Sequence, residues 1–402
     1  MREIVYAWPY LEWGGAQRYF MVLMKYAKPH YRVTAVIPAG TSPTVIGFLD
    51  EIGIRHEVFH DRFDVTPVTT IGGRIRRRRL KPRWERAMLE VLLRRDLSNA
   101  LFHIDIAPWT SPRLLRHLAQ EARAVVTLHT ALIRPATWRR RIWRRNFSAV
   151  TALPRFQTIA ANEDVRRSLA PYIPAETLAK VPLAYSPVDV DEVTSITSQP
   201  PDRAARLAGV GIRPDQFVVA TAAQFIERKG CWTLLDAARR LRRDHPDIRF
   251  VWLSTLPLSE PDRRRVAEYG LGDVFRHVTA AEFGSLRADY LGLLRAADVF
   301  VLPSFEEGLP LAMLEAMAIG LPVISTPVNA IPEAIVSGRD GLLVAPGSAE
   351  ALAAAIARLK SSPDLRASLA SAGRHRAVTE FDSRTMADVT LGVYAASFAR
   401  PC

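Results

Sequence analysis

The chain has 402 residues, of which 49% are hydrophobic, so we expect at least two globular domains and exclude a largely disordered chain. It contains only two cysteines, which excludes a disulfide-stabilised scaffold and favours a reducing compartment such as the cytoplasm. The net charge is +13; residues 1–200 carry 30 Lys and Arg against 18 Asp and Glu, and the rest carry 24 against 23, so the first half is expected to meet an anionic partner.

The first 190 residues alternate predicted strands with helices. A strand over 3–8 leads into the Gly14-Gly15 turn and a helix from about residue 16, and further strands are predicted at 31–38, 101–106, 124–128 and 156–161. Two glycines between strand and helix let a ligand approach the backbone closely, although a plain tight turn explains them equally well. The GxGxxG fingerprint of dinucleotide-binding proteins is absent.

His129 directly follows the predicted strand 124–128, in the run Thr127-Leu128-His129-Thr130. Ligands bind at the carboxyl ends of strands in open α/β sheets, so this histidine is a candidate binding residue. A hydrogen-bonded structural histidine is the alternative interpretation.

Two arginine-rich stretches account for much of the positive charge. Residues 74–83 form a loop or the start of a helix, because their apolar residues follow no clear period. In the second stretch, Trp138 and Ile142 share one helix face and five arginines surround them, with Trp143 following. This pattern is typical of a basic amphipathic segment at an anionic membrane, and a solvated arginine-rich face is the alternative. No nucleic-acid-binding motif accompanies it, so nucleic acid is not expected as a partner. The predicted membrane or acceptor patch comprises Trp138, Arg139, Arg140, Trp143, Arg144 and Arg145.

Residues 182–203 are rich in Pro, Ser and Thr and lack periodicity, so they are interpreted as an interdomain linker. The predicted domains are 1–190 and 206–380, with a linker over 191–205 and a last helix over 381–402. The Asp189-Val190-Asp191 triplet could hold a metal bound to a sugar nucleotide, but a structural role is favoured because no strand precedes it.

A second alternating set predicts a second doubly wound α/β domain, with strands at 217–223, 249–253, 275–278, 297–302, 323–325 and 341–344. Lys229 and Gly230 open the helix after the first of these strands, where a lysine can meet phosphate charge. Glu307 lies in the turn before another helix and Glu315 lies within it. At a helical rise of about 1.5 Å per residue, eight residues span roughly 12 Å, close to the length of a sugar diphosphate with its ribose.

The segment PSFEEGLPLAMLEAMAIGLPVIST, with Glu307 and Glu315 inside it, resembles the signature of retaining glycosyltransferases of the family 4 type, which have the GT-B architecture. The runs FIERKG (225–230), TLHT (127–130) and the Gly14-Gly15 turn are similar to other parts of that family, in the same order. The resemblance is strong over 217–360 and looser over the first 190 residues. It implies two Rossmann-like domains facing a cleft. By this resemblance the N-terminal domain, 1–190, would bind the acceptor, the C-terminal domain, 206–380, would bind a nucleotide-sugar, and the last helix, 381–402, would cross back to the N-terminal domain.

The resemblance also implies a role for each site residue. Glu315 would bind the ribose hydroxyls, Glu307 the hydroxyls of the donor sugar, and Lys229 the diphosphate, while His129 would lie near the transferred sugar. Lys229, Glu307 and His129 are therefore the predicted catalytic residues. The predicted donor-binding residues are Gly14, Gly15, Gln224, Arg228, Lys229, Glu307, Gly308, Leu309 and Glu315.

This sequence departs from the family pattern in three places. After the predicted strand 249–253, Ser254-Thr255-Leu256-Pro257 replaces the usual glycine-rich turn. Gln224 stands where the family often has arginine, which removes one charge from the diphosphate site, and Asn329-Ala330 replaces a Gly-Gly pair. All three departures affect donor geometry and base preference more than they affect the class.

Catalysis would come from stabilisation of the leaving diphosphate, with transfer on the same face of the sugar. Glu307 and Glu315 lie along the donor rather than across the anomeric carbon, so no glycosyl-enzyme intermediate is expected. No metal-ligand cluster is evident, so neither a metal nor another cofactor is predicted. Alternatives are a nucleotide-sugar epimerase of similar fold and a non-catalytic nucleotide-sugar-binding protein.

We expect a UDP-sugar donor and a glycan or lipid-linked acceptor, as in the biosynthesis of cell-envelope polysaccharides. The predicted location is the cytoplasm, with peripheral attachment to the inner face of the cell membrane.

Overall fold

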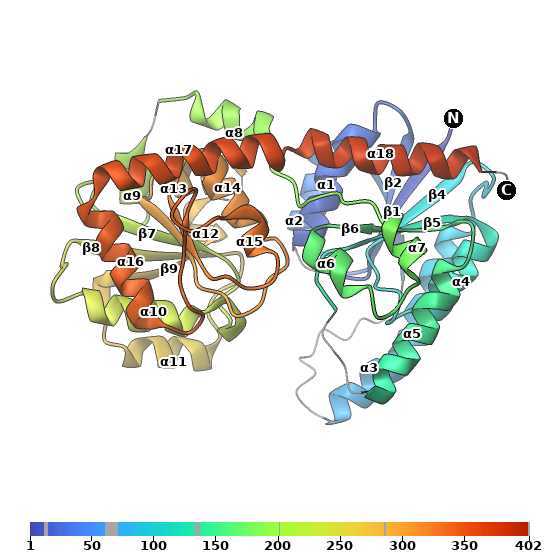
Figure 1. The fold of residues 1–402 in the computed structure, drawn as a ribbon, viewed down its shortest axis with the longest axis horizontal. Coiled ribbons are helices and arrows are strands. Elements are labelled where there is room, and N and C mark those ends of the chain that lie inside the picture. The colour runs from blue at the N-terminus through green and yellow to red at the C-terminus, as the bar shows by residue number, and fades with distance from the viewer. Residues whose placement is uncertain (12–14, 61–70, 133–136, 201, 285–286, 401–402) are drawn as a thin grey trace. The chain divides into compact units, whose positions relative to one another are not determined.

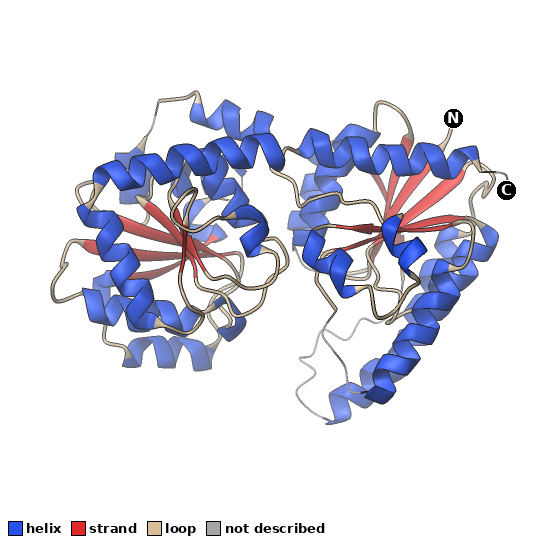
Figure 2. Cartoon of the chain, viewed as in Figure 1, coloured by secondary structure: helices blue, strands red, loops and turns tan. Residues whose placement is uncertain are grey.

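The computed structural model describes residues 1–11, 15–60, 71–132, 137–200, 202–284 and 287–400. Within these ranges the chain forms two compact units (Figure 1). The first comprises residues 1–186 together with 383–402, and the second comprises residues 187–382. In each unit, helices lie on both sides of one parallel sheet (Figure 2). Since parallel strands buried on both faces read as nearly continuous apolar runs, this arrangement explains segments such as EIVYA and FVVATA.

The sheet of the first unit has six parallel strands in the order β3-β2-β1-β4-β5-β6. These strands are β1 (Glu3–Ala7), β2 (Arg32–Pro38), β3 (Arg55–Phe59), β4 (Ala100–Ile104), β5 (Arg123–Leu128) and β6 (Phe156–Ala160). Successive strands are added to one side of β1 up to β3 and to its other side from β4 onward. Open α/β sheets bind ligands at such a reversal of strand order, here between β1 and β4.

Two sets of helices cover this sheet. One core cluster joins the sheet to α1, α2 and α18, and another joins its opposite face to α3, α4 and α5. The helices of this unit are α1 (Gly15–Ala27), α2 (Pro43–Glu51), α3 (Ile71–Leu92), α4 (Pro112–Glu121), α5 (Thr137–Thr151), α6 (Glu163–Ser168), α7 (Ala175–Ala179) and α18 (Ser383–Ala399). The arginine-rich stretch 74–83 therefore lies inside a 22-residue helix, α3, which also contains Pro82.

The C-terminal helix α18 belongs to the first unit although it is last in the chain. Its residue Ser383 lies 2.9 Å, hydroxyl to hydroxyl, from Tyr26 of α1. Further along the helix, Arg123 of β5 donates to the carbonyl of Ser397 at 2.9 Å. These contacts fasten both ends of α18 to the sheet and to α1.

The second unit repeats the architecture with the strand order β12-β11-β10-β7-β8-β9. Its strands are β7 (Phe217–Ala222), β8 (Ile248–Ser254), β9 (Phe275–Thr279), β10 (Val299–Leu302), β11 (Val323–Ser325) and β12 (Leu342–Leu343). Its α-helices are α8 (Val190–Thr197), α9 (Arg203–Gly209), α10 (Cys231–Leu241), α11 (Glu260–Glu268), α12 (Ala280–Phe283), α13 (Arg287–Arg295), α14 (Leu311–Ile319), α15 (Ile331–Ala334), α16 (Ala349–Ser361) and α17 (Pro363–Glu380). All six strands predicted for this unit are present, within two residues at each end.

The segment 191–205, predicted as a linker, contains most of α8 and the start of α9, both within the second unit. The hydrophobic pattern of the sequence does not reveal α8, because the helix is only eight residues long and Val193 is its buried residue. Asp189 is the N-cap of α8, and its Oδ1 accepts from the N–H of Glu192 at 3.1 Å. The D-x-D triplet therefore starts a helix, as its favoured structural interpretation requires.

Candidate active site

The predicted donor residues of the second unit follow the carboxyl ends of adjacent strands. Lys229 comes after β7, Glu307 after β10 and Asn329 after β11, and these three strands are neighbours in the sheet. A parallel sheet places all these ends on one edge, so residues as far apart as 229 and 329 meet there.

Gly230 fixes how closely the loops after β7 and β10 approach each other. Its φ is +75°, in the left-handed region, and a Cβ at this position would lie 2.0 Å from the carbonyl oxygen of Pro303. Only glycine is compatible with both conditions. The loops are also joined by backbone: the N–H of Phe305 donates to the carbonyl of Arg228 at 2.9 Å. The Arg228 guanidinium in turn donates to the carbonyl of Glu306 at 2.9 Å.

These contacts between the two loops place Lys229 next to Glu307. The ammonium nitrogen of Lys229 lies 2.6 and 2.7 Å from the two carboxylate oxygens of Glu307. Ser304 donates its hydroxyl to Oε1 of the same carboxylate at 2.7 Å. Glu307 is only 4% exposed, and a buried carboxylate needs such partners to stay ionised. The sequence predicted both residues for the donor site but not that they would pair with each other.

Asn329 completes the environment of Glu307. Its side-chain oxygen accepts from the backbone N–H of Glu307 at 3.1 Å. Its φ is +47°, the one positive φ of a non-glycine residue in the described chain. Asparagine tolerates this conformation better than most residues, so it can replace the first glycine of the family's Gly-Gly pair while adding a hydrogen bond that glycine lacks.

Glu315 lies in the second turn of α14 and is also paired. Arg287, at the start of α13, donates to both Glu315 and Glu192, the latter at 3.0 Å. Burial lowers the pKa of the Arg287 guanidinium, but the charges of Glu315 and Glu192 outweigh it, and the pKa is raised overall. No sequence motif marks Arg287 or Glu192 as a partner of Glu315, because they belong to two other helices, α13 and α8.

Helix α14 starts later than the sequence suggests. Its first residue is Leu311, and its N-cap is Pro310, which forms no side-chain cap. Gly308 and Leu309 therefore precede the helix, and the helical rise applies only from residue 311. The first N–H groups of a helix have no intrahelical acceptors, so the start of α14 can still receive an anion. Gln224 is exposed directly after β7.

In the first unit, His129 follows β5 and is half-buried, with its ring 4.8 Å from that of Tyr19 in an edge-to-face arrangement. Burial lowers its pKa to about 4, so the imidazole is neutral at pH 7. Its Nε2 has no hydrogen-bond partner in the described structure. Gly15 begins α1, whereas Gly14 lies outside the described residues.

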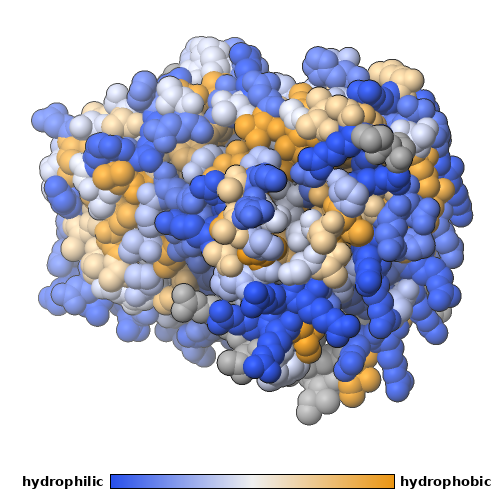
Figure 3. Space-filling view, turned by 45° about the vertical axis from the view of Figure 1, so that its right-hand side comes forward, coloured by the Kyte–Doolittle hydropathy of each residue, from blue (hydrophilic) through white to orange (hydrophobic). Residues whose placement is uncertain are grey.

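The arginine-rich helix α5 exposes Trp138 (61%) and Ile142 (49%) among its arginines Arg139, Arg140, Arg144 and Arg145. Trp143 differs from these residues, because it stacks on Trp109 at 5.7 Å between ring centroids and packs against the core. Trp143 is therefore a structural residue of the predicted patch. In Figure 3, hydrophilic surface gathers in the lower part of the view, the level at which α3 and α5 lie in Figure 1. Within the described residues, no helix is long and apolar enough to cross a membrane.

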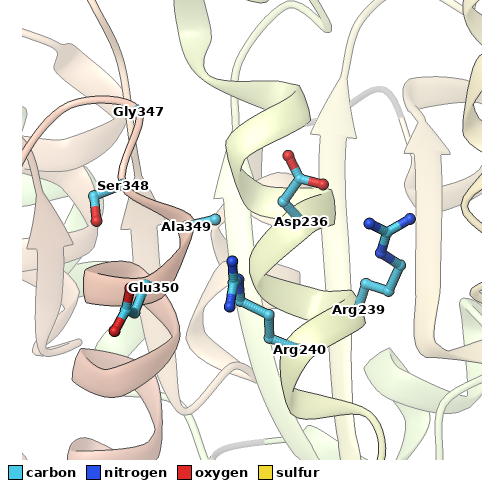
Figure 4. Close-up of a pocket in the computed structure, with 7 residues that line it drawn as sticks. All are labelled: Asp236, Arg239, Arg240, Gly347, Ser348, Ala349 and Glu350. Atoms are coloured by element: carbon cyan, nitrogen blue, oxygen red, sulfur yellow. The ribbon is translucent and has the colours of Figure 1, made fainter.

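A separate pocket of about 660 Å³ lies between α10 and the start of α16 (Figure 4). It is lined by Asp236, Arg239, Arg240, Gly347, Ser348, Ala349 and Glu350. None of the predicted donor residues lines it. The described residues contain no group of three or more His, Cys, Asp or Glu side chains arranged to hold a metal.

Comparison with known proteins finds a family similarity in the second unit. Residues 202–376 match the family model described as glycosyl transferases group 1. The matched segment contains Lys229, Glu307, Asn329 and Glu315, whereas Glu192 precedes it.

Curated relatives and solved structures extend the likeness. The chain is 33% identical over 186 residues to an MMP alpha-(1->4)-mannosyltransferase of Mycolicibacterium hassiacum, covering 46% of this chain and 44% of that protein. It is 34% identical over 232 residues to a D-inositol 3-phosphate glycosyltransferase of Pseudarthrobacter chlorophenolicus, covering 56% and 54%. The chain thus spans about half the length of the curated relatives it matches. The crystal structure of HepE of Anabaena with UDP-glucose aligns over 98% of this chain and 100% of that one, with a TM-score of 0.78 and 18% identity. This likeness over the whole chain confirms the predicted GT-B fold of two doubly wound domains.

Proposed function

We propose that the protein is a retaining glycosyltransferase of the family 4 type that transfers a hexose from a UDP-sugar to a glycan or lipid-linked acceptor. The paired Lys229 and Glu307, within the segment that matches group 1 glycosyl transferases, are the observation that carries this proposal. The relatives named as glycosyltransferases and the UDP-glucose complex of HepE support the donor class.

The paired lysine would serve the leaving group. Cleavage of the anomeric bond builds negative charge on the diphosphate, and a preorganised cation beside it lowers the barrier. Lys229 is held by the buried carboxylate of Glu307, so little reorganisation is needed when a diphosphate arrives. Glu307 would accept hydrogen bonds from donor-sugar hydroxyls, and Glu315 from the ribose.

Both glutamates lie on one segment along the donor, so they do not flank the anomeric carbon as the carboxylates of retaining hydrolases do. We therefore propose same-face transfer without a glycosyl-enzyme intermediate. The donor's charge would be met by Lys229, Arg228 and the start of α14 without a metal ion. His129, kept neutral by burial, would hydrogen-bond the transferred sugar.

The acceptor would bind the first unit. The exposed Trp138 and Ile142 among arginines favour a lipid-linked or cell-envelope glycan acceptor and peripheral attachment to the inner face of the cell membrane. The protein would then act in the cytoplasm in polysaccharide biosynthesis.

A donor panel tests the proposal. Thermal shift with UDP-, GDP- and ADP-sugars reports binding, because a ligand that binds only the folded state raises its stability. We expect UDP-glucose or a related UDP-sugar to raise the melting temperature, and release of UDP in the presence of acceptor glycans to follow. If a nucleotide-sugar binds without any turnover, the chain is instead a binding protein, an alternative suggested by the uncharged and exposed Gln224. If none binds, the donor assignment is wrong.

A further inference from the structure

Three charged side chains from three different helices of the second unit form one connected group. Arg287 of α13 lies between Glu192 of α8 and Glu315 of α14, and the side chains are 17%, 19% and 8% exposed, respectively. Helix α8 packs against both α13 and α14. Its N-cap, Asp189, accepts from the backbone N–H of Glu192 and so fixes the start of the helix that carries this carboxylate. The group is therefore built into the packing of three helices.

The two carboxylates hold the guanidinium of Arg287 in different ways. Glu192 accepts from Nε at 3.3 Å and from Nη2 at 3.0 Å, which is the two-point contact that arginine forms with a carboxylate. Glu315 accepts only from Nη2, through its Oε1. The ring of Tyr290 lies 5.1 Å from the guanidinium carbon and adds a cation–π contact. Glu192 and Tyr290 thus fix Arg287, which presents one N–H to Glu315.

Glu315 keeps one carboxylate oxygen for another donor. Among the residues that the structure describes, Arg287 is the one hydrogen-bond partner of this carboxylate. Glu307 differs, because Lys229 meets both of its oxygens. An ionised carboxylate can only accept hydrogen bonds, so Oε2 of Glu315 suits a group that donates. Adjacent hydroxyls of a ribose, the ligand proposed above for Glu315, are such donors.

The balance of charge shows that the group does more than join helices. Arg287 and Glu192 already form a complete two-point ion pair, and a second carboxylate adds negative charge that one guanidinium cannot neutralise. Burying such an excess charge is costly unless further donors satisfy it. Ligand hydroxyls at Glu315 would supply those donors.

The contact with Arg287 also orders Glu315 before a ligand arrives. A glutamate side chain loses rotamer freedom when it is immobilised, and this loss weakens binding when it falls on the binding step. The rigid, planar fork of arginine can hold the carboxylate in one orientation, whereas the flexible ammonium of a lysine cannot. Arg287 thus prepares the second oxygen of Glu315 for a hydroxyl ligand.

We propose that Arg287, held by Glu192, is a positioning residue that orients Glu315 toward the ribose of the donor, and that this arrangement selects ribonucleotides over nucleotides without ribose hydroxyls. The inference rests on the proposed glycosyltransferase function. It adds to that function two residues outside the sequence signature and the part of the nucleotide whose recognition depends on them.

Isothermal titration calorimetry of the full chain with UDP and with 2′,3′-dideoxy-UDP tests this role. The native chain should bind UDP more tightly by roughly tenfold or more, because the dideoxy nucleotide lacks the hydrogen bonds to a charged group. Arg287→Lys keeps a positive charge between the carboxylates but loses the fork. This variant should reduce the ratio of the two affinities to about threefold or less, because UDP binds more weakly while the dideoxy nucleotide binds as before. A purely structural role would instead weaken both nucleotides alike.

Glu192→Ala removes the acceptor that holds Arg287 and should lower the ratio in the same way, although residue 192 would not touch the nucleotide. Arg206→Lys is the matched control. Arg206 pairs with Asp289, also on α13, at 2.9 Å, and in the described structure it hydrogen-bonds none of the predicted donor residues. It should keep the native ratio. Thermal unfolding of each variant shows that it is folded.

The inference is overturned if folded Arg287→Lys keeps the native ratio, if it loses affinity for both nucleotides alike, or if Arg206→Lys loses the ratio equally. Equal binding of UDP and the dideoxy nucleotide by the native chain would overturn it as well, while leaving nucleotide binding intact. A native chain that binds neither nucleotide would refute the UDP-sugar donor of the proposed function itself, so the two failures are distinguishable.

Discussion

Lys229 and Glu307 form a bidentate ion pair, with 2.6 and 2.7 Å between the ammonium nitrogen and the two carboxylate oxygens. The residues are far apart in the chain but follow neighbouring strands, β7 and β10. Because the carboxylate is buried, neither partner can be removed without leaving the other charge unpaired.

Glu307→Gln should therefore lower transfer by roughly 100-fold or more, since one misplaced oxyanion-stabilising group commonly costs 10²–10³ in rate. Affinity for UDP should change much less, because the role proposed for Glu307 is to bind the donor sugar rather than the nucleotide. Initial rates of UDP release and a UDP titration measure the two effects. Glu306→Gln is the control, because only its backbone carbonyl makes a contact with Arg228. Equal losses in both variants would contradict the assignment.

Gly230→Ala should destabilise the second unit by about 2–4 kcal/mol. The added Cβ would lie 2.0 Å from the Pro303 carbonyl, and alanine is strained at φ +75°. Gly209→Ala is the matched control: a Cβ there meets nothing within 4 Å and lies at the end of helix α9, so stability should stay level or rise by up to about 1 kcal/mol. Urea unfolding measures both. A Gly230→Ala variant as stable as the native chain would show that the loops separate freely.

Arg287→Met should destabilise the protein by about 3–5 kcal/mol, because it removes the guanidinium that the largely buried carboxylates of Glu315 and Glu192 share. Adding Glu192→Gln should restore part of the loss by removing one of the two charges. Thermal unfolding of the single and double variants gives the coupling between the sites. No restoration in the double variant would mean that Arg287 acts through packing.

Asp105→Asn should become progressively more stabilising as the pH rises. Burial raises the pKa of Asp105 from 3.8 to about 7, so the folded state binds its proton more tightly than the unfolded state does. The resulting stability is present below pH 4 and is lost as the pH rises to about 7. His129 and His103 act in the opposite direction, since burial lowers their pKa values, and both remain in the variant.

The difference in unfolding free energy between Asp105→Asn and the native chain isolates the carboxyl group. It should grow by about 2–3 kcal/mol between pH 5 and pH 8, because each pKa unit corresponds to about 1.4 kcal/mol. Denaturant unfolding at several pH values gives this difference. A constant difference would show that the native carboxyl group titrates normally.

Removal of four α5 arginines should weaken binding to anionic liposomes at least tenfold, since each basic residue near such a surface contributes about 1 kcal/mol. The variant replaces Arg139, Arg140, Arg144 and Arg145 with serine. Flotation with liposomes containing anionic lipid measures the effect. A control variant removes the same charge from the second unit by replacing Arg213, Arg243, Arg263 and Arg264. Equal flotation of the two variants would mean that net charge alone attracts the protein.

The amino-acid sequence alone determined the two alternating α/β sets, most strand positions and the candidate donor residues. Those features are local: buried parallel strands read as apolar runs, and the family signature occupies one continuous segment. The hydrophobic pattern did not identify two helices. In α3 the many arginines hide any apolar period, and α8 is too short to show one.

Only the tertiary structure decided which charged groups meet. Lys229 pairs with Glu307, Arg287 joins Glu315 to Glu192, and Asn329 supplies a hydrogen bond in place of a glycine. The order of strands in a parallel sheet differs from their order in the chain, so residues a hundred positions apart share one edge.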